Sequence, residues 1–281
     1  MAYQLSPRLR FGLKLLGAKL AISAALAVAL MSSGCGLLDT ARPRPLSVVV
    51  GLDETSFAET YWDPSVRAAQ AIVLDLNPRD RIQVNAISVC SNDDNAVLLK
   101  DAKLPLTLSA GTYFAKNEAR QTALALGQMK RRVPNGNGTD IVGALRNAAA
   151  VFERNAAAPA GADYPTYQPV LVLCSDMQPD DHKPLEEVRA QPFVLPPDTR
   201  VRCLFVVKEL PPDLSGRPQP TSTATDPELA WNKLVDMWVK VFAEVGVKVT
   251  RADFKKVEES TVAAPNRAPA LREFLHQARY H

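Results

Sequence analysis

Several sequence signatures of enzymes are missing from this chain of 281 residues. It contains neither a GxxxxGK[ST] nor a GxGxxG stretch, so it lacks the glycine-rich loops that cradle phosphate groups. Its three histidines, His182, His276 and His281, occur without the partner residues that a catalytic triad or a zinc site needs. We therefore expect the chain not to be an enzyme.

A concentrated basic region is also missing beyond the first residues. The formal net charge is +3, and a leader without acidic residues supplies the excess through Arg8, Arg10, Lys14 and Lys19. The rest of the chain is close to neutral. Because nucleic-acid binding requires a concentrated basic face, we expect no nucleic-acid partner.

Cysteine is scarce, with Cys35, Cys90, Cys174 and Cys203 the only four in the chain. No CxxC motif or Cys/His spacing indicates a zinc site. The last three cysteines lie within or at the end of apolar, strand-like runs. We expect them to be buried free thiols, and one disulfide among them is the alternative in an oxidising compartment.

The leader has the organisation of a signal peptide. Its basic residues precede an apolar stretch at residues 20–31, and Ser-Ser-Gly-Cys follows. This ending resembles the lipobox of bacterial lipoproteins, in which the cysteine becomes lipidated, although Ser32 occupies the usual leucine position. We predict a signal peptide at 1–34, a lipid attached to Cys35, and a location in the bacterial cell envelope that faces the periplasm or exterior. An uncleaved membrane anchor at 20–38 is the alternative.

The remaining chain alternates strand-like and helix-like segments, which predicts an α/β fold. After a tether at 35–45, one domain should span 46–254, with a C-terminal tail and a short, loosely attached helix at 255–281. The fold class is a Rossmann-like, doubly wound, mostly parallel sheet with helices on both faces. We expect an edge strand within 95–109, because Pro105 disfavours a central one, and a last strand at 247–250.

Polar side chains follow three of these segments. Asp53 and Thr55 follow the first strand in VVVGLDETSF, Thr139 lies in GNGTDIVGAL ahead of a helix, and Asp176 follows a later strand in VLVLCSDMQ. These pieces resemble the metal-ion-dependent adhesion site of the von Willebrand factor type A (vWA) family. That family combines Asp-x-Ser-x-Ser after the first strand, a threonine before a helix, and an aspartate after the fourth strand.

The resemblance implies a function and a set of ligands. Asp53, Thr55, Thr139 and Asp176 would hold Mg²⁺ or Mn²⁺, with Ca²⁺ as a further candidate, because these hard cations prefer oxygen ligands. An acidic side chain of another protein would complete the site. Phe57 departs from the pattern because it stands at the second serine position and offers no oxygen. A metal-free, degenerate vWA scaffold in an envelope complex is therefore the alternative.

Two further interpretations use the same residues. Taken singly, Asp53 and Asp176 could stabilise turns, and Thr139 could cap the helix that follows it. Asp53 could also be the nucleophile of a haloacid-dehalogenase-like phosphatase. That family places an aspartate two residues later as the general acid, whereas this chain has Thr55, which cannot exchange a proton near neutral pH.

Overall fold

The computed structural model describes residues 43–54, 62–88, 97–103, 111–129, 139–157, 166–178, 183–206, 227–257 and 269–280. The chain divides into two units, Met1–Pro43 and Arg44–His281, and every helix and strand discussed below belongs to the second. The signal peptide and Cys35 lie outside the described residues, so the expectations about them stay predictions. Within the described part of the chain, no helix is long and apolar enough to cross a membrane.

The described strands form a six-stranded sheet in the order β3-β2-β1-β4-β5-β6. The strands are β1 (Leu46–Asp53), β2 (Arg81–Ile87), β3 (Val97–Lys103), β4 (Gln168–Cys174), β5 (Arg200–Val206) and β6 (Phe254–Val257). All neighbours pair in parallel except β3, which is antiparallel to β2 at the edge. The predicted fold class, a doubly wound and mostly parallel vWA-like sheet, is confirmed, as is the placement of an edge strand within residues 95–109.

The central strand β1 shows why the sequence adopts this sheet. All eight of its residues are buried. Its side chains alternate between the two faces, so that Val48 and Val50 join one hydrophobic cluster and Val49 joins the other. A strand with apolar residues on both faces is stable only if both faces are covered, which requires two layers of helices.

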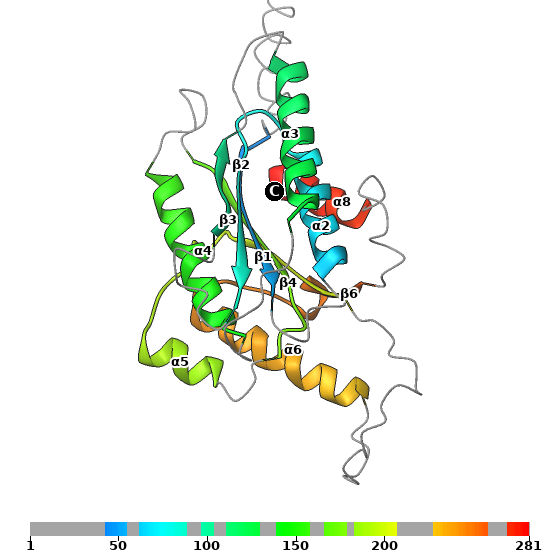
Figure 1. Ribbon diagram of the computed structural model, residues 1–281. Helices are drawn as coiled ribbons and strands as arrows, with labels where there is room; N and C mark the ends of the chain where they lie inside the picture. Colours follow the sequence, from blue (N-terminus) through cyan, green and yellow to red (C-terminus); the bar gives the residue numbers. More distant parts are fainter. Residues whose placement is uncertain are drawn as a thin grey trace, which may run out of the picture. The chain divides into compact units, whose positions relative to one another are not determined.

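The helices supply these two layers. They are α2 (Trp62–Asp75), α3 (Gly111–Gly127), α4 (Ile141–Ala156), α5 (Pro184–Ala190), α6 (Pro227–Glu244) and α8 (Pro269–Tyr280). Helices α2, α3 and α8 cover one face of the sheet, and α4, α5 and α6 cover the other (Figure 1). The short helix α5 was not expected from the sequence.

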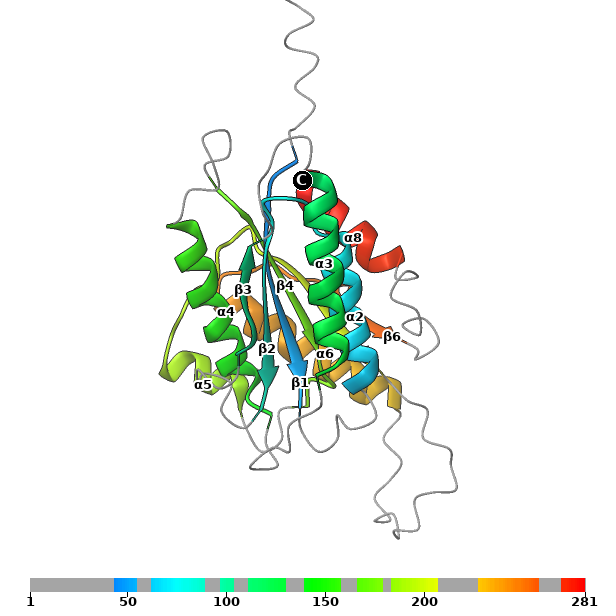
Figure 2. The same cartoon turned by 45° about the horizontal axis from the view of Figure 1, so that its top comes forward.

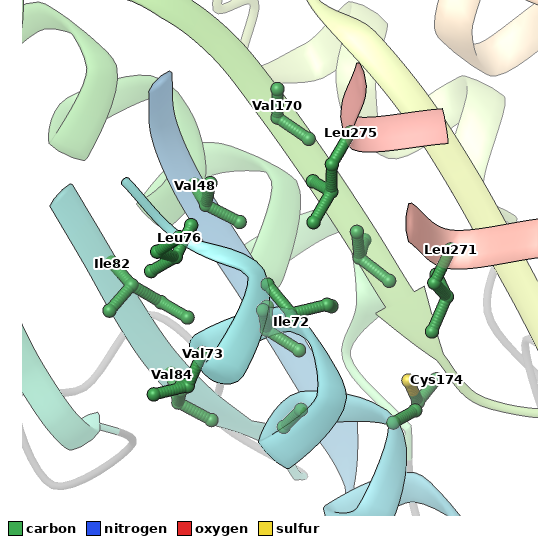
Figure 3. Close-up of a cluster of buried hydrophobic side chains, with 14 of the residues drawn as sticks. Val48, Ile72, Val73, Leu76, Ile82, Val84, Val170, Cys174, Leu271 and Leu275 are labelled. Atoms are coloured by element: carbon green, nitrogen blue, oxygen red, sulfur yellow. The ribbon is translucent and has the colours of Figure 1, made fainter. Parts of the chain in front are cut away.

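The C-terminal helix α8 is an integral part of the first layer. Leu271 and Leu275 point from α8 toward the sheet, beside Ile72 of α2 and Val170 of β4 (Figure 3). Leu275 is completely buried. The expectation of a loosely attached tail helix is therefore wrong. The buried apolar residues of α8, Leu271, Phe274, Leu275 and Ala278, share one face, and their packing partners lie far away in the chain.

The last strand also differs from the prediction. Val247 and Val249 are buried, but the strand itself is β6, at Phe254–Val257. The side chain of Asp253 accepts hydrogen bonds from the backbone N–H and the hydroxyl of Thr250, at 2.8 and 2.9 Å. This capping box opens a 3₁₀ turn, Arg251–Asp253, and delays entry into the sheet.

The prediction of buried free thiols is confirmed for the two later cysteines. Cys174 and Cys203 are free, buried thiols, and burial raises the pKa of Cys174 to about 12. Cys90 lies outside the described residues. Trp238 of α6 is completely buried and belongs to the core.

Candidate functional site

The candidate site lies at the edge of the sheet where the parallel strands end. Asp53, the last residue of β1, pairs with Ile87 of β2, and Leu52 pairs with Cys174 of β4. The arrowheads of β1 and β2 reach the same edge (Figure 2). We call this region the carboxyl edge. In open parallel sheets, ligands bind outside the carboxyl ends of the strands.

A hydrogen bond joins the ends of β1 and β4. The hydroxyl of Ser175 donates to Oδ2 of Asp53 at 2.6 Å and accepts a bond from the backbone N–H of Met177 at 2.9 Å. The Asp53 carboxylate is nearly enclosed, with 4% of the residue exposed. This bond fixes the carboxylate and brings Asp176, the next residue along, to the same edge.

The loop that carries Asp176 is held from the helix layer. Met177 adopts a left-handed conformation with φ of 56°, which is uncommon for a residue other than glycine. Its carbonyl accepts a hydrogen bond from the indole N–H of Trp238 at 2.8 Å. Asp176 is partly exposed, and its Oδ1 accepts a bond from the backbone N–H of Gln178 at 3.0 Å. These bonds give the loop a defined conformation.

Thr139 and Asp140 approach the same edge from the start of α4. The backbone N–H of Asp140 donates to the carbonyl of Ser88, the residue after β2, at 2.8 Å. Thr139 is buried. The helix cap is Asp140, whose carboxylate accepts from the N–H of Gly143 at 2.6 Å. The N-cap position of α4 is therefore Asp140, and not Thr139 as in the structural alternative.

Gly143 explains part of the GTDIVGAL pattern. A Cβ atom at this position would overlap the carboxylate of Asp140. Only glycine therefore lets the Asp140 side chain fold back over the first turn of α4. This cap holds the start of α4, and with it Thr139, against the end of β2.

The structure thus brings three of the four predicted ligands, Asp53, Thr139 and Asp176, to one edge. Thr55 lies outside the described residues, as does Phe57. Within the described ranges, no group of three or more His, Cys, Asp or Glu side chains could hold a metal ion. A cation at this edge would therefore depend on two carboxylates and several hydroxyl groups. Such a set consists of oxygen ligands only, which fits a hard divalent cation.

Sequence reasoning missed the role of Ser175. The sequence marks it as the residue after a strand, but its bond to Asp53 depends on the register between β1 and β4. The sequence interpretation considered Thr139 as the cap of this helix, whereas the cap is Asp140. The bond from Trp238 to the loop carried no sequence signal.

This chain has similarities to solved structures. No protein-family model matches the sequence, and a search of curated proteins gives no match. Among solved structures, the chain is similar to a von Willebrand factor type A protein from Catenulispora acidiphila, with 13% identity and a TM-score of 0.47. The similarity covers 84% of this chain and 43% of that one, so the chain spans less than half of that protein's length.

Two other solved structures are similar to this chain. The conserved hypothetical protein BatB from Bacteroides thetaiotaomicron has 13% identity and a TM-score of 0.47, and 83% of this chain and 98% of that one are covered. The manganese-loaded TRAP protein of Plasmodium vivax has 12% identity and a TM-score of 0.36, with 72% and 74% covered. The doubly wound fold stated above rests on the strand order and directions and not on these similarities.

Proposed function

We propose that this chain is a membrane-tethered, extracytoplasmic vWA-like module that binds another protein at the carboxyl edge of its sheet. The observation that carries the proposal is the hydrogen bond from Ser175 to Asp53. It joins two neighbouring strand ends and holds a nearly buried carboxylate at the position where parallel sheets bind ligands. Asp176 is the residue directly after Ser175 in the chain.

The proposed site holds Mg²⁺ or Mn²⁺, with Ca²⁺ as a further candidate, through Asp53, Thr55, Thr139 and Asp176. When bound, the cation supplies positive charge that attracts an acidic side chain of the partner protein. Asp53 contributes a carboxylate with a fixed orientation. Asp176 contributes a second, partly exposed carboxylate on a loop that Trp238 restrains.

The second candidate function is that of a metal-free vWA scaffold in an envelope complex. One observation favours it: the Ser175 hydroxyl already gives Asp53 a hydrogen-bond partner without a cation. Phe57 stands where the family has a serine, so the site lacks one hydroxyl ligand in both candidates. The two candidates share the fold and differ in whether binding needs a divalent ion.

Metal-dependent melting separates the two candidates. A cation that binds only the folded state stabilises it by about 2.7 kcal/mol at 100 times its dissociation constant. The wild type should therefore melt at a higher temperature with millimolar Mn²⁺ or Mg²⁺, and Asp53→Asn should remove the shift because it removes a charged ligand. The matched control is Glu153→Gln, at an exposed carboxylate near the far end of α4.

The variant Phe57→Ser tests whether the native protein is the metal-free, degenerate form. Restoring the hydroxyl should enlarge the metal-dependent shift. A shift in Phe57→Ser but not in the wild type would favour the metal-free scaffold. Equal shifts in the wild type, Asp53→Asn and Glu153→Gln would mean that the ions bind elsewhere, and the proposed site would be wrong.

The proposal also assigns a location and excludes catalysis. The lipid anchor at Cys35 places the module in the bacterial cell envelope, and Cys35→Ser should release it from membranes or leave an unprocessed precursor. Unchanged membrane retention with normal processing would contradict the anchor.

Because Thr55 cannot act as a general acid, the protein should not hydrolyse phosphate esters with Mg²⁺ present. Turnover that disappears in Asp53→Asn would contradict this and support the phosphatase.

A further inference from the structure

A cavity of about 650 Å³ lies at the opposite edge of the sheet, which we call the amino edge. Its lining includes Gln168 and Arg200, the first residues of β4 and β5, together with part of α8. Helix α8 reaches this end of the sheet, away from the arrowheads of β1 and β2 (Figure 2). The cavity is thus separate from the site at Asp53. Its volume is within the range of small-molecule binding sites.

Basic side chains outnumber acidic ones in this lining. Arg44, Arg200, Arg202 and Lys248 face two acidic residues, Asp198 and Asp253. Both acids already have partners. Asp198 pairs with Arg44 at 3.4 Å, and one carboxylate oxygen of Asp253 accepts two bonds in the capping box at Thr250.

Two of the cations have no such partner. The side chains of Arg200 and Lys248 are exposed and make no hydrogen bond or ion pair with any residue in the described part of the chain. Arg202 is held in place instead: its guanidinium lies 4.6 Å from the ring centre of Phe274, and its Nη1 donates to the carbonyl of Ala252 at 2.9 Å. The cavity therefore combines one restrained guanidinium with two cations that are available to a ligand.

We propose that this cavity binds a phosphate-bearing anion. Phosphate oxygens accept paired hydrogen bonds from guanidinium groups, and Lys248 adds a positive point charge. A restrained Arg202 loses little conformational freedom on binding, which favours affinity. The volume exceeds that of inorganic phosphate, so the ligand should carry a further group, such as the glycerol of a phospholipid headgroup or of a soluble phosphate ester.

In the sequence, the cavity-lining residue Arg44 lies close to the predicted lipid anchor. Arg44 lies within the tether at residues 35–45 and lines the cavity. A tether of about ten residues reaches roughly 30 Å at most, so a lipid on Cys35 would keep the cavity near the membrane surface. The headgroup source of the anion rests on the proposed lipid anchor, whereas the soluble source does not.

Titration of the purified full chain in a neutral detergent tests the proposal. One arm uses inorganic phosphate and glycerol 3-phosphate, and the other uses mixed micelles with phosphatidylglycerol or phosphatidylcholine. The double variant Arg200→Gln/Lys248→Gln should weaken binding about tenfold or more, because both charged donors are lost. The matched control is Lys233→Gln/Lys240→Gln, which removes two exposed lysines of α6.

The outcomes distinguish a lipid headgroup from a soluble ligand, and both from the absence of a specific anion site. Stronger binding to phosphatidylglycerol than to phosphatidylcholine, lost in the cavity variant, identifies a headgroup. Binding of glycerol 3-phosphate alone, lost in the same variant, identifies a soluble ligand and holds even if the anchor at Cys35 is wrong. Absence of binding in both arms overturns the proposal, as does an equal loss in the control variant, which would indicate general charge attraction.

Discussion

Each of the two edges of the sheet contains a buried aspartate, and the two aspartates have different partners. At the carboxyl edge, Asp53 accepts a hydrogen bond from the neutral hydroxyl of Ser175. At the amino edge, Asp80 pairs with Arg279 at 2.6 Å and also accepts from the backbone N–H groups of Leu46 and Asn77. Both aspartates are almost fully buried. At Asp80, a charged partner and two backbone N–H groups tie α8, the end of α2 and the start of β1 together. At Asp53, the hydrogen bond from Ser175 joins the ends of β1 and β4 and comes from a neutral group.

The Asp80 cluster explains how the amino edge is held together. Arg279 belongs to α8, and its Nη2 donates to the carbonyl of Asp75 at the end of α2. The carbonyl of Arg279 accepts from the backbone N–H of Arg44, just before β1. The C-terminal helix, the end of α2 and the start of β1 therefore meet at one buried charge pair.

The largest effect should come from breaking this pair. Arg279→Met leaves the Asp80 carboxylate buried without its countercharge, which typically costs about 3–5 kcal/mol. Urea denaturation at pH 7 measures the loss. A loss below about 1 kcal/mol would mean that the pair is not structural and would remove the contrast between the two edges.

The pH dependence of that loss sharpens the same test. Burial raises the pKa of Asp80 above its usual value, although Arg279 and two backbone N–H groups oppose the shift. An acid with a raised pKa in the folded state contributes stability at low pH that is lost as the pH rises through the folded-state pKa. Removing Arg279 raises this pKa further, so the deficit of Arg279→Met should be smaller near pH 4 than at pH 7.

A smaller effect is expected at the carboxyl edge. Ser175→Ala removes the hydroxyl donor of Asp53 and the acceptor of the Met177 N–H, which should cost about 1–3 kcal/mol. The comparison variant is Ser47→Ala, whose buried hydroxyl accepts from Asn155 near the other end of β1. Both variants should lose stability, but only Ser175→Ala should also change the response to Mn²⁺. Identical responses to Mn²⁺ in the two variants would mean that Ser175 does not contribute to the proposed site.

The smallest effect concerns the buried thiols of β4 and β5, Cys174 and Cys203. With a pKa of about 12, Cys174 carries almost no thiolate at pH 8.5. Iodoacetamide should therefore leave Cys174 and Cys203 unmodified in the folded protein and modify both in guanidinium chloride. Rapid modification of the native protein would contradict the packing of β4 and β5.

The sequence predicted the sheet well because a strand buried on both faces is apolar along most of its length, as β1 and β4 are. It did not predict how α8 packs, because the partners of its apolar face and of Arg279 lie far away in the chain. The placement of β6 failed for a local reason, since Val247 and Val249 pack in the core without joining the sheet. A capping box at Thr250 starts a turn first.

The site was predictable in part for the same reasons. Asp53 and Asp176 follow apolar strands, so their place at the carboxyl edge follows from the strand pattern. The bond between Ser175 and Asp53 depends on the register of two strands more than a hundred residues apart in sequence. The cation-rich cavity combines Arg44, just before β1, with residues of β5 and α8, and no single stretch of sequence contains it.

The central claim is that the carboxyl edge holds a divalent cation for a partner's acidic side chain. A crystal structure in millimolar Mn²⁺, with the anomalous signal of the metal recorded, tests it most directly. The account predicts anomalous density in contact with the carboxylate of Asp53 and close to Thr139 and Asp176. An ordered carboxyl edge with no such density, or with Thr139 turned away from Asp53, would contradict the claim.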